Sequence, residues 1–239
     1  MAKTILHTAS TRGHADHGWL DTYHSFSFAS WYDPERMHFG ALRVLNDDYV
    51  KGGFGFGKHP HDNMEIITIV LKGALEHQDS MGHTQAIHSN EVQVMSAGSG
   101  VFHSEYNHNK NEDVNLIQIW IFPDKQNVAP RYDQRVFEAA DRQDKLQTLV
   151  SPINKEDDGL KINQDAWIYR TELAAGKELD LKLHSDKHGL YAFVIEGSIS
   201  VNGQKLNRRD ALGISDTDSI KIEASEGSDI ILLEVPMYA

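Results

Sequence analysis

The stretch "GFGKHPHDNMEIITIVLKG", residues 55–73, places two histidines one residue apart, then a glutamate, then an apolar run that ends in glycine. Successive side chains of a β-strand point to opposite faces. If no bulge intervenes, His59, His61 and Glu65 point to the same face of one strand. A histidine pair at this spacing is more often incidental than a metal site, so a second segment must supply further ligands.

Composition limits what such a face can do. The 239 residues suffice for one large domain or two ordinary ones of roughly 100 to 150 residues each. The absence of cysteine excludes disulfides, thiolate ligands, iron–sulfur clusters and cysteine nucleophiles, so any metal is held by nitrogen and oxygen. A net charge of -12 opposes direct binding of nucleic acid. We see neither a signal peptide nor an apolar run of about 18 residues, and therefore expect a cytoplasmic protein without a membrane partner.

Short β-rich runs recur between glycine, asparagine and aspartate turn signals, which predicts an antiparallel sandwich or barrel. Helical periodicity is weak, and the best helix candidate is "PRYDQRVFEAADRQ", residues 130–143. The predicted strand segments are "FGALRVLND", "MEIITIVLKG", "NEVQVMSAG", "VNLIQIWIF", "LKINQDAWIYRTEL", "LYAFVIEGSISVNG", "DALGIS", "SIKIEA" and "DIILLEV".

The two halves of the chain resemble each other. "IITIVLKGALE" matches "YAFVIEGSISV" with Gly73 on Gly197, "NEVQVMS" matches "RDALGIS", and "NLIQIWIFP" matches "DIILLEVP". Such a divergent repeat predicts two copies of one β module. We place the boundary between about residues 130 and 150, which gives domains 1–135 and 136–239.

The second chemical segment is "SAGSGVFHSEYN", residues 96–107. Its glycines permit a turn, after which His103 and Glu105 share one face of an extended strand. If this strand packs beside the one that carries His59 and His61, three imidazoles and one or two carboxylates surround a point. That set suits iron, nickel, copper, manganese or zinc.

These residues resemble the two cupin motifs, "G-x-H-x-H-x-x-x-E" and "G-x-G-x-x-H-x-x-x-N". The chain departs from the general pattern in two places: seven residues rather than six separate Glu65 from Gly73, and Gly98 stands where proline is usual. Four segments in order, "RGHADHGWLDTYHSFSFASWYDP", "HPHDNMEIITIVLKG", "EHQDSMG" and "MSAGSGVFHSEYN", are more specifically similar to bacterial pirins.

The resemblance implies an all-β bicupin of two jelly-roll barrels, with one divalent transition metal in the N-terminal barrel. Carried over residue by residue, the metal ligands are His59, His61, His103 and Glu105. Iron is the expected metal, with nickel, copper, manganese or zinc as alternatives. Glu105 and Glu65 are the catalytic candidates, Glu65 lying behind the ligands to orient an imidazole or to take a substrate proton.

Four protein ligands on an octahedral ion leave two positions for substrate and dioxygen. The resemblance implies a quercetin 2,3-dioxygenase reaction, in which a flavonol-like substrate is ring-opened by O2 with release of carbon monoxide. We expect the protein to be a monomer. The alternative is a non-catalytic, iron-state-sensing regulator that acts through a protein partner. A pocket above the metal favours the enzyme, whereas a sealed metal and a broad exposed patch favour the regulator.

The remaining histidines lack the paired-strand pattern. His77 and Asp79 are possible pocket residues, although turn-stabilising roles are the stronger expectation. The C-terminal module is predicted to hold no metal, and His184 and His188 do not restore a site, since His184 falls one residue out of register. Aligning the repeat carries the five motif positions onto residues without matching ligand atoms: Leu183, Ser185, Gly189, Ile222 and Ala224.

Overall fold

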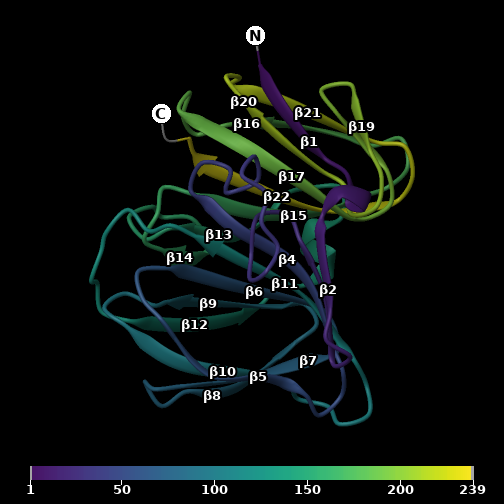
Figure 1. Ribbon diagram of the computed structural model, residues 1–239. Helices are drawn as coiled ribbons and strands as arrows, with labels where there is room; N and C mark the ends of the chain where they lie inside the picture. Colours follow the sequence, from purple (N-terminus) through teal and green to yellow (C-terminus); the bar gives the residue numbers. More distant parts are fainter. Residues whose placement is uncertain (1, 238–239) are drawn as a thin grey trace.

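The alternating segments form strands throughout a computed structural model, which describes residues 2–237 (Figure 1). Within this range the helical elements are two short 3-10 turns, η1 (Ala9–Thr11) and η2 (Ala139–Arg142). No helix in the same range is long and apolar enough to cross a bilayer. The predicted all-β class is therefore confirmed.

The first barrel combines a seven-stranded sheet, in the order β12-β9-β6-β11-β4-β3-β2, with a four-stranded sheet, β5-β10-β7-β8. Its strands are β2 (Gly13–Asp16), β3 (Leu20–His24), β4 (Leu42–Val50), β5 (Gly55–His61), β6 (Glu65–Lys72), β7 (Ala74–Asp79), β8 (Thr84–His88), β9 (Glu91–Ser96), β10 (Val101–Asn107), β11 (Val114–Ile121) and β12 (Arg131–Val136).

The second barrel repeats this plan with a seven-stranded sheet, β1-β20-β17-β22-β15-β13-β14, and a four-stranded sheet, β16-β21-β18-β19. Two barrels of matching layout are the bicupin arrangement that the resemblance implied. The strands are β1 (Lys3–His7), β13 (Gln147–Pro152), β14 (Leu160–Ile162), β15 (Trp167–Leu173), β16 (Glu178–Lys182), β17 (His188–Glu196), β18 (Ile199–Val201), β19 (Gln204–Leu206), β20 (Ala211–Ser215), β21 (Ser219–Ala224) and β22 (Ser228–Pro236).

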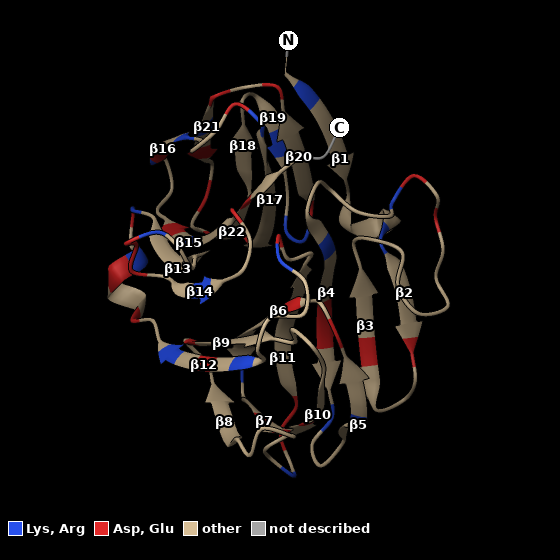
Figure 2. Cartoon of the chain, turned by 90° about the vertical axis from the view of Figure 1, so that its left-hand side faces the viewer, with Lys and Arg blue, Asp and Glu red and all other residues tan. Residues whose placement is uncertain are grey.

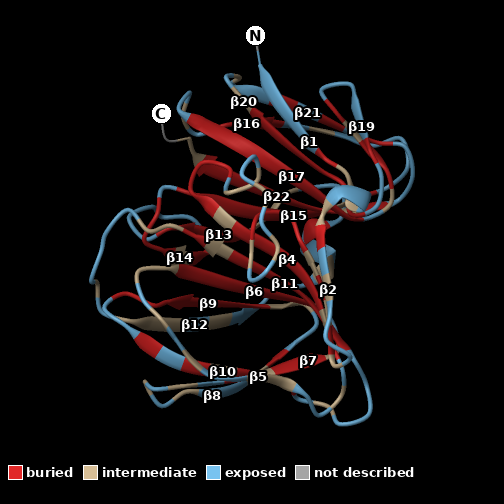
Figure 3. Ribbon diagram, in the orientation of Figure 1, coloured by how far each residue is buried: buried red, intermediate tan, exposed pale blue. Residues whose placement is uncertain are grey.

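The two seven-stranded sheets pack against each other and form the largest apolar core, in the middle of the molecule (Figure 3). Ile67 and Ile117 of the first barrel belong to the same buried cluster as Phe193 and Ile231 of the second. Along β17 the alternate residue Val194 instead enters the core of the second barrel. A sheet buried on both faces explains why these strands read as nearly continuous apolar runs.

The predicted repeat has a structural counterpart at its glycines. Gly73 lies between β6 and β7, and Gly197 lies between β17 and β18. At both points the chain passes from a seven-stranded to a four-stranded sheet, with φ of 80° at Gly73 and 88° at Gly197. Glycine adopts this left-handed conformation without the steric penalty of a Cβ atom.

One expectation about a connecting segment needs correction. The helix candidate at residues 130–143 forms β12, which pairs with β9, followed by the 3-10 turn η2. Edge pairing along "RYDQRV" outweighs its weak helical pattern, because each strand residue gains a ladder partner. In addition, β1 at the start of the chain pairs with β20 of the second barrel. The boundary between residues 135 and 136 stays a prediction.

Candidate metal centre

Three histidines converge inside the first barrel because β5 and β10 are antiparallel neighbours. His103 lies directly opposite His59 in the register, and Val101 lies opposite His61. The imidazole centroids of His59, His61 and His103 are 4.4 to 4.8 Å apart. One ring nitrogen from each lies within 4.8 Å of the others. The structure therefore brings together three of the four predicted metal ligands as a compact donor set.

A chain of hydrogen bonds behind His103 selects its tautomer. The Asp79 carboxylate accepts a hydrogen bond from Nε2 of His77 at 3.2 Å, which leaves Nδ1 of His77 as an acceptor. That atom lies 3.5 Å from Nδ1 of His103, which is then the donor. The lone pair of His103 therefore lies on Nε2, a buried atom with no hydrogen-bond partner. Such support of a ligand imidazole by a histidine and a carboxylate is typical of metal sites.

His59 is oriented in a similar way. Its Nδ1 donates to the carbonyl oxygen of Gly57 at 2.8 Å, so its Nε2 carries the free lone pair. Asp79 also accepts the backbone N–H groups of Met81 and His83, which fixes the turn after β7. The turn-stabilising role expected for Asp79 is thus observed.

Electrostatics keeps two of the imidazoles neutral. Burial lowers the pKa of His61 to about 3, with further lowering by the neighbouring His103 and His59. Burial likewise lowers the pKa of His103 to about 3, with further lowering by His59 and His77. A neutral imidazole has the lone pair that a metal needs, so these groups require no proton loss near neutral pH.

Glu105 lies on the same strand as His103, beyond a β-bulge between the two residues. Its carboxylate is buried and accepts hydrogen bonds from Nε2 of Gln118 at 3.2 Å and from the hydroxyl of Thr68 at 3.5 Å. Desolvation raises its pKa, while nearby histidines and these hydrogen bonds oppose the rise. Glu105 shares a possible ligand group with His77 and His103, overlapping the first group at His103.

Glu65 is not brought to this cluster. The strand that carries His59 ends at His61, Asn63 adopts a φ of 45°, and β6 begins in the other sheet. The expected single strand face from His59 to Glu65 is therefore wrong. The buried Glu65 carboxylate instead accepts hydrogen bonds from the Ser96 hydroxyl at 2.6 Å and from Nδ2 of Asn163 at 3.1 Å. It links the two halves of the chain.

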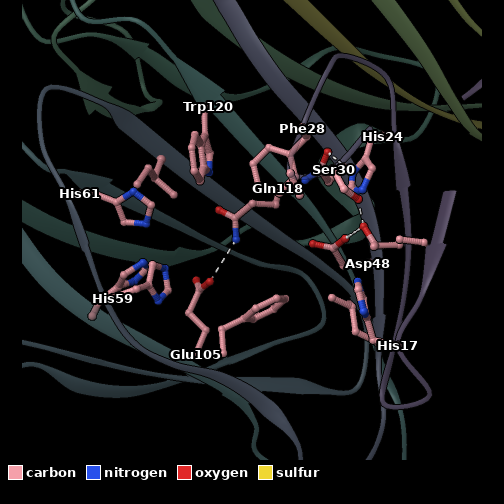
Figure 4. Close-up of a pocket in the computed structure, with 18 residues that line it drawn as sticks. His17, His24, Phe28, Ser30, Asp48, His59, His61, Glu105, Gln118 and Trp120 are labelled. Carbon is pink, nitrogen blue, oxygen red and sulfur yellow. Dashed lines mark hydrogen bonds between the residues drawn. The ribbon is translucent and has the colours of Figure 1, made fainter. Parts of the chain in front are cut away.

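A cavity of about 420 Å³ adjoins the histidines. His59 and His61 lie on one side, His17, His24 and Asp48 lie on the other, and Glu105 and Gln118 lie between them (Figure 4). Apolar and aromatic walls complete it, contributed by Leu20, Phe28, Phe56, Ile66 and Trp120. Its volume is in the usual range for a small-molecule site, and an apolar lining with a few polar groups suits an aromatic ligand.

The wall opposite the histidines is polar and buried. The Thr22 hydroxyl donates to Oδ1 of Asp48 at 2.5 Å, and Nδ1 of His24 donates to Oδ1 of Asn46 at 3.0 Å. Burial raises the pKa of Asp48 to about 7, and the negative charges of Asp47 and Glu105 add to this rise. Near neutral pH this carboxyl therefore exists in both protonation states.

Several of these cavity residues were not anticipated from the sequence. Gln118 is a polar residue within the apolar run "NLIQIWIF", and Asp48 follows the apolar half of "RVLNDDYV". A polar side chain at the centre of a buried strand must find a partner, because leaving it unpaired in the interior is costly. A polar residue that interrupts an apolar strand segment is therefore the sequence signal that could have identified Gln118 and Asp48.

The donor chemistry fits a divalent transition metal. The two overlapping donor groups consist of imidazole nitrogens and, in the second group, the Glu105 carboxylate, without sulfur. The unpartnered, buried Nε2 of His103 is the strongest structural sign, since buried polar atoms are normally hydrogen-bonded. A cation at the centre of the histidines would satisfy this atom.

Comparisons with known proteins agree with this geometry. The family model described as "Pirin" matches residues 6–121, and the model described as "Quercetinase C-terminal cupin domain" matches residues 148–235. Escherichia coli K12 quercetin 2,3-dioxygenase is 44% identical over 231 residues, which cover 97% of this chain and 98% of the relative. A pirin-like protein of Caulobacter vibrioides is 44% identical over 93% of this chain and 95% of its own.

Solved structures extend the likeness to three dimensions. The bacterial pirin YhhW of Escherichia coli in complex with nickel(II) superimposes with a TM-score of 0.93 at 42% identity, covering 99% of this chain and 100% of that one. A quercetin 2,3-dioxygenase of Acinetobacter baumannii has a TM-score of 0.77 at 20% identity, covering 99% of this chain and 79% of its own. The latter likeness concerns the fold alone.

Proposed function

The chain belongs to the pirin family, and on that premise we propose that it is a metal-dependent dioxygenase of the quercetin 2,3-dioxygenase type. The observation that carries the proposal is the unpartnered Nε2 of His103, which lies with His59 and His61 at the wall of a cavity of about 420 Å³. A site with room for an aromatic molecule beside the metal ligands fits an enzyme.

In this proposal His59, His61, His103 and Glu105 hold the metal. When bound, a divalent transition metal supplies Lewis acidity toward oxygen donors and, if it is redox-active, the means to use dioxygen. Iron is our first choice, with nickel, copper, manganese and zinc as alternatives. The N/O donor set admits all five.

The chain's own side chains would bind and orient the substrate. Phe28, Phe56 and Trp120 offer aromatic surfaces to a flat flavonol-like molecule and exclude water from it. Glu105 would take the proton of the hydroxyl group that enters beside the histidines, and Gln118 would hold that carboxylate in place through its hydrogen bond. Glu65 would act only indirectly, through the Ser96 and Asn163 contacts that fix the barrel wall.

The far wall gives the substrate a second polar contact. Asp48, Thr22 and His24 lie across the cavity from the metal ligands and can exchange hydrogen bonds with hydroxyl groups on the remote ring of a flavonol. We further propose a monomeric cytoplasmic enzyme whose domains meet between residues 135 and 136. The cavity beside the histidines favours this enzyme over a regulator with a sealed metal.

The test begins with elemental analysis of protein purified without added metal or chelator. Anaerobic reconstitution with each candidate ion then precedes measurement of oxygen consumption and carbon monoxide release with a flavonol. We expect both signals to require the metal and to disappear in His61→Ala. If fully loaded protein consumes no oxygen with any flavonol for any of the five ions, the dioxygenase proposal is wrong.

A further inference from the structure

Two arginines from opposite halves of the chain meet in the interior. Arg12 precedes β2, whereas Arg209 lies in the turn between β19 and β20. Each side chain is only 5% exposed. Arg209 also adopts a φ of 65°, a left-handed conformation that is unfavourable for a residue with a Cβ atom. The chain thus accepts backbone strain at the residue that brings this second guanidinium to the junction.

One carboxylate serves both guanidinium groups. Oδ2 of Asp47 lies 3.5 Å from Nη1 of Arg12 and 3.4 Å from Nε of Arg209, while its Oδ1 accepts a hydrogen bond from Asn115 at 2.9 Å. Nε and Nη1 of both arginines are buried and form no hydrogen bond, although Nη1 of Arg12 and Nε of Arg209 are the atoms that face Asp47. Nη2 of Arg209 donates to the Tyr49 hydroxyl at 3.4 Å and to Oδ1 of Asn115 at 3.5 Å. Glu196, which is half exposed and pairs with Arg208, approaches Arg209 only to 3.7 Å.

The charge at this junction is therefore incompletely compensated. Two buried cations face one buried carboxylate, and burying an unpaired charge is unfavourable. Desolvation lowers the pKa of Arg12; the nearby Asp47 opposes the lowering, and the charge of Arg209 adds to it. An additional anion would relieve the repulsion and satisfy the free N–H groups.

Space for such an anion exists beside the pair. A cavity of about 410 Å³ is lined by both arginines and by Arg208, Tyr23, Tyr49 and Ser10, and its acidic lining residues are Asp21 and Asp47. Asp21 is paired with His14 at 2.7 Å. These two aspartates belong to the paired strands β3 and β4, and both strands have acidic segments in Figure 2. The volume exceeds that of a simple inorganic anion, so an organic acid also fits.

We propose that this cavity between the barrels binds an oxyanion, as a carboxylate or phosphate group, through the guanidinium groups of Arg12 and Arg209. Planar guanidinium donors match both anions in bidentate geometry. Tyr49 offers an aromatic surface to an organic portion of the ligand, whereas the Tyr23 ring is already stacked with His14 and has the Arg12 guanidinium over it.

This site is separate from the metal cavity. Along β4, Asp47 and Tyr49 line the anion cavity, whereas Asn46 and Asp48 line the metal cavity. The two ligands would therefore lie on opposite faces of one strand, as alternation of side chains requires. The inference does not depend on the dioxygenase proposal.

The test titrates the full-length protein with inorganic phosphate and, separately, with benzoate, by calorimetry and by thermal melting, against chloride at equal ionic strength. We expect saturable binding of at least one anion and a melting temperature that rises with its concentration. Arg209→Gln and Arg12→Gln should each weaken binding about tenfold or more, since a charge-assisted bidentate contact is lost. The exposed Lys182→Gln, which makes the same charge change on β16, should bind as the wild type does.

Further titrations identify the class of ligand and distinguish binding in this cavity from binding in the metal cavity. Stronger binding of phosphate or of benzoate assigns the phosphate or the carboxylate class. Because benzoate could also enter the metal cavity, the titration is repeated in His61→Ala, where the anion affinity should be unchanged. The proposal is overturned if the wild type binds neither anion, or if Arg12→Gln binds as tightly as Lys182→Gln.

Discussion

The two barrels share a strand plan but are filled differently. In the second barrel, apolar side chains from both sheets form one continuous buried cluster, which includes Leu183, Ile222 and Ala224. The repeat alignment predicted these positions as counterparts of His59, His103 and Glu105. The strand register instead matches those three residues to Leu181, Ile220 and Ile222, which belong to the same apolar cluster. In the first barrel the apolar residues divide into two smaller clusters, around Val70 and around Ile66, and the histidines and the cavity lie beside them.

This difference shows that a few side chains decide whether the barrel is a scaffold or a site. His184 and His188 of the second barrel both direct Nδ1 to the Glu234 carboxylate, at 2.9 and 2.8 Å. Nε2 of His188 lies 3.5 Å from the Asp165 carboxylate, and the partly exposed His184 ring stacks on Trp167, in contrast with the buried, unpartnered Nε2 of His103. That the second barrel holds no metal stays a prediction, which its apolar filling supports.

The largest effect should follow removal of a predicted ligand. His103→Ala or His61→Ala deletes a nitrogen donor, so bound metal should fall severalfold or more and turnover by about a hundredfold or more. Elemental analysis and oxygen consumption check both quantities, and circular dichroism should show that the β fold persists.

The paired variant His184→Ala/His188→Ala is the matched control in the second barrel. It should retain its metal and its activity. If the control loses metal while His61→Ala and His103→Ala keep it, the assignment of site and scaffold to the two barrels is reversed.

A matched pair of core truncations compares filled and hollow interiors. Ile222→Ala in the second barrel should lower the free energy of unfolding by about 3 to 4 kcal/mol, through lost burial and a new cavity. Ile66→Ala should cost about 1 kcal/mol less, because Ile66 already borders the metal cavity. Denaturant unfolding measures both. Equal losses in the free energy of unfolding would mean that the neighbouring cavity does not reduce the effect of truncating Ile66.

The equivalent glycines sharpen the comparison of the two modules. Gly197→Ala should destabilise by about 2 to 3 kcal/mol, because a Cβ would lie 2.4 Å from the carbonyl oxygen of Gly227 in addition to the strain of positive φ. Gly73→Ala should cost about 1 to 2 kcal/mol, since its nearest contact, the carbonyl oxygen of Asp113, is at 3.1 Å. Thermal melting ranks the two; the reverse order would show that the turn at Gly73 is the tighter one.

The smallest effect concerns pH and the polar wall of the first barrel. The pKa of Asp48 is raised from 3.8 to about 7 by burial, so the folded state binds an extra proton between about pH 4 and 7. Raising the pH through this window therefore lowers the free energy of unfolding, and the penalty is fully present above about pH 7.

Asp48→Asn removes this titration while keeping an oxygen to accept the Thr22 hydrogen bond. The variant should gain stability relative to the wild type as pH rises, by roughly 1 to 2 kcal/mol, since water in the cavity screens part of the charge. Unfolding at pH 5 and pH 8 measures the gain. A constant difference at both values would show that Asp48 does not titrate in this window.

Much of the fold and part of the candidate site could be predicted from strand pattern and motif spacing. Alternation predicted the strands and the all-β class, and the repeat predicted two similar modules. The two motif segments named His59, His61 and His103, which the structure brings together because their strands pair; their role as ligands stays a prediction. Glu65 was misplaced, because the turn at Asn63 sends β6 into the other sheet.

Sequence by itself determined what depends on local periodicity, namely which segments are strands and which faces are apolar, and it showed which side chains have atoms able to bind a metal. Only the tertiary structure decided which distant side chains meet, namely Asp79 and His77 behind His103, Asp48 across the cavity, and Arg12 beside Arg209. Side-chain alternation is a property of each strand alone, whereas these contacts depend on strand order and on the packing of one sheet against another.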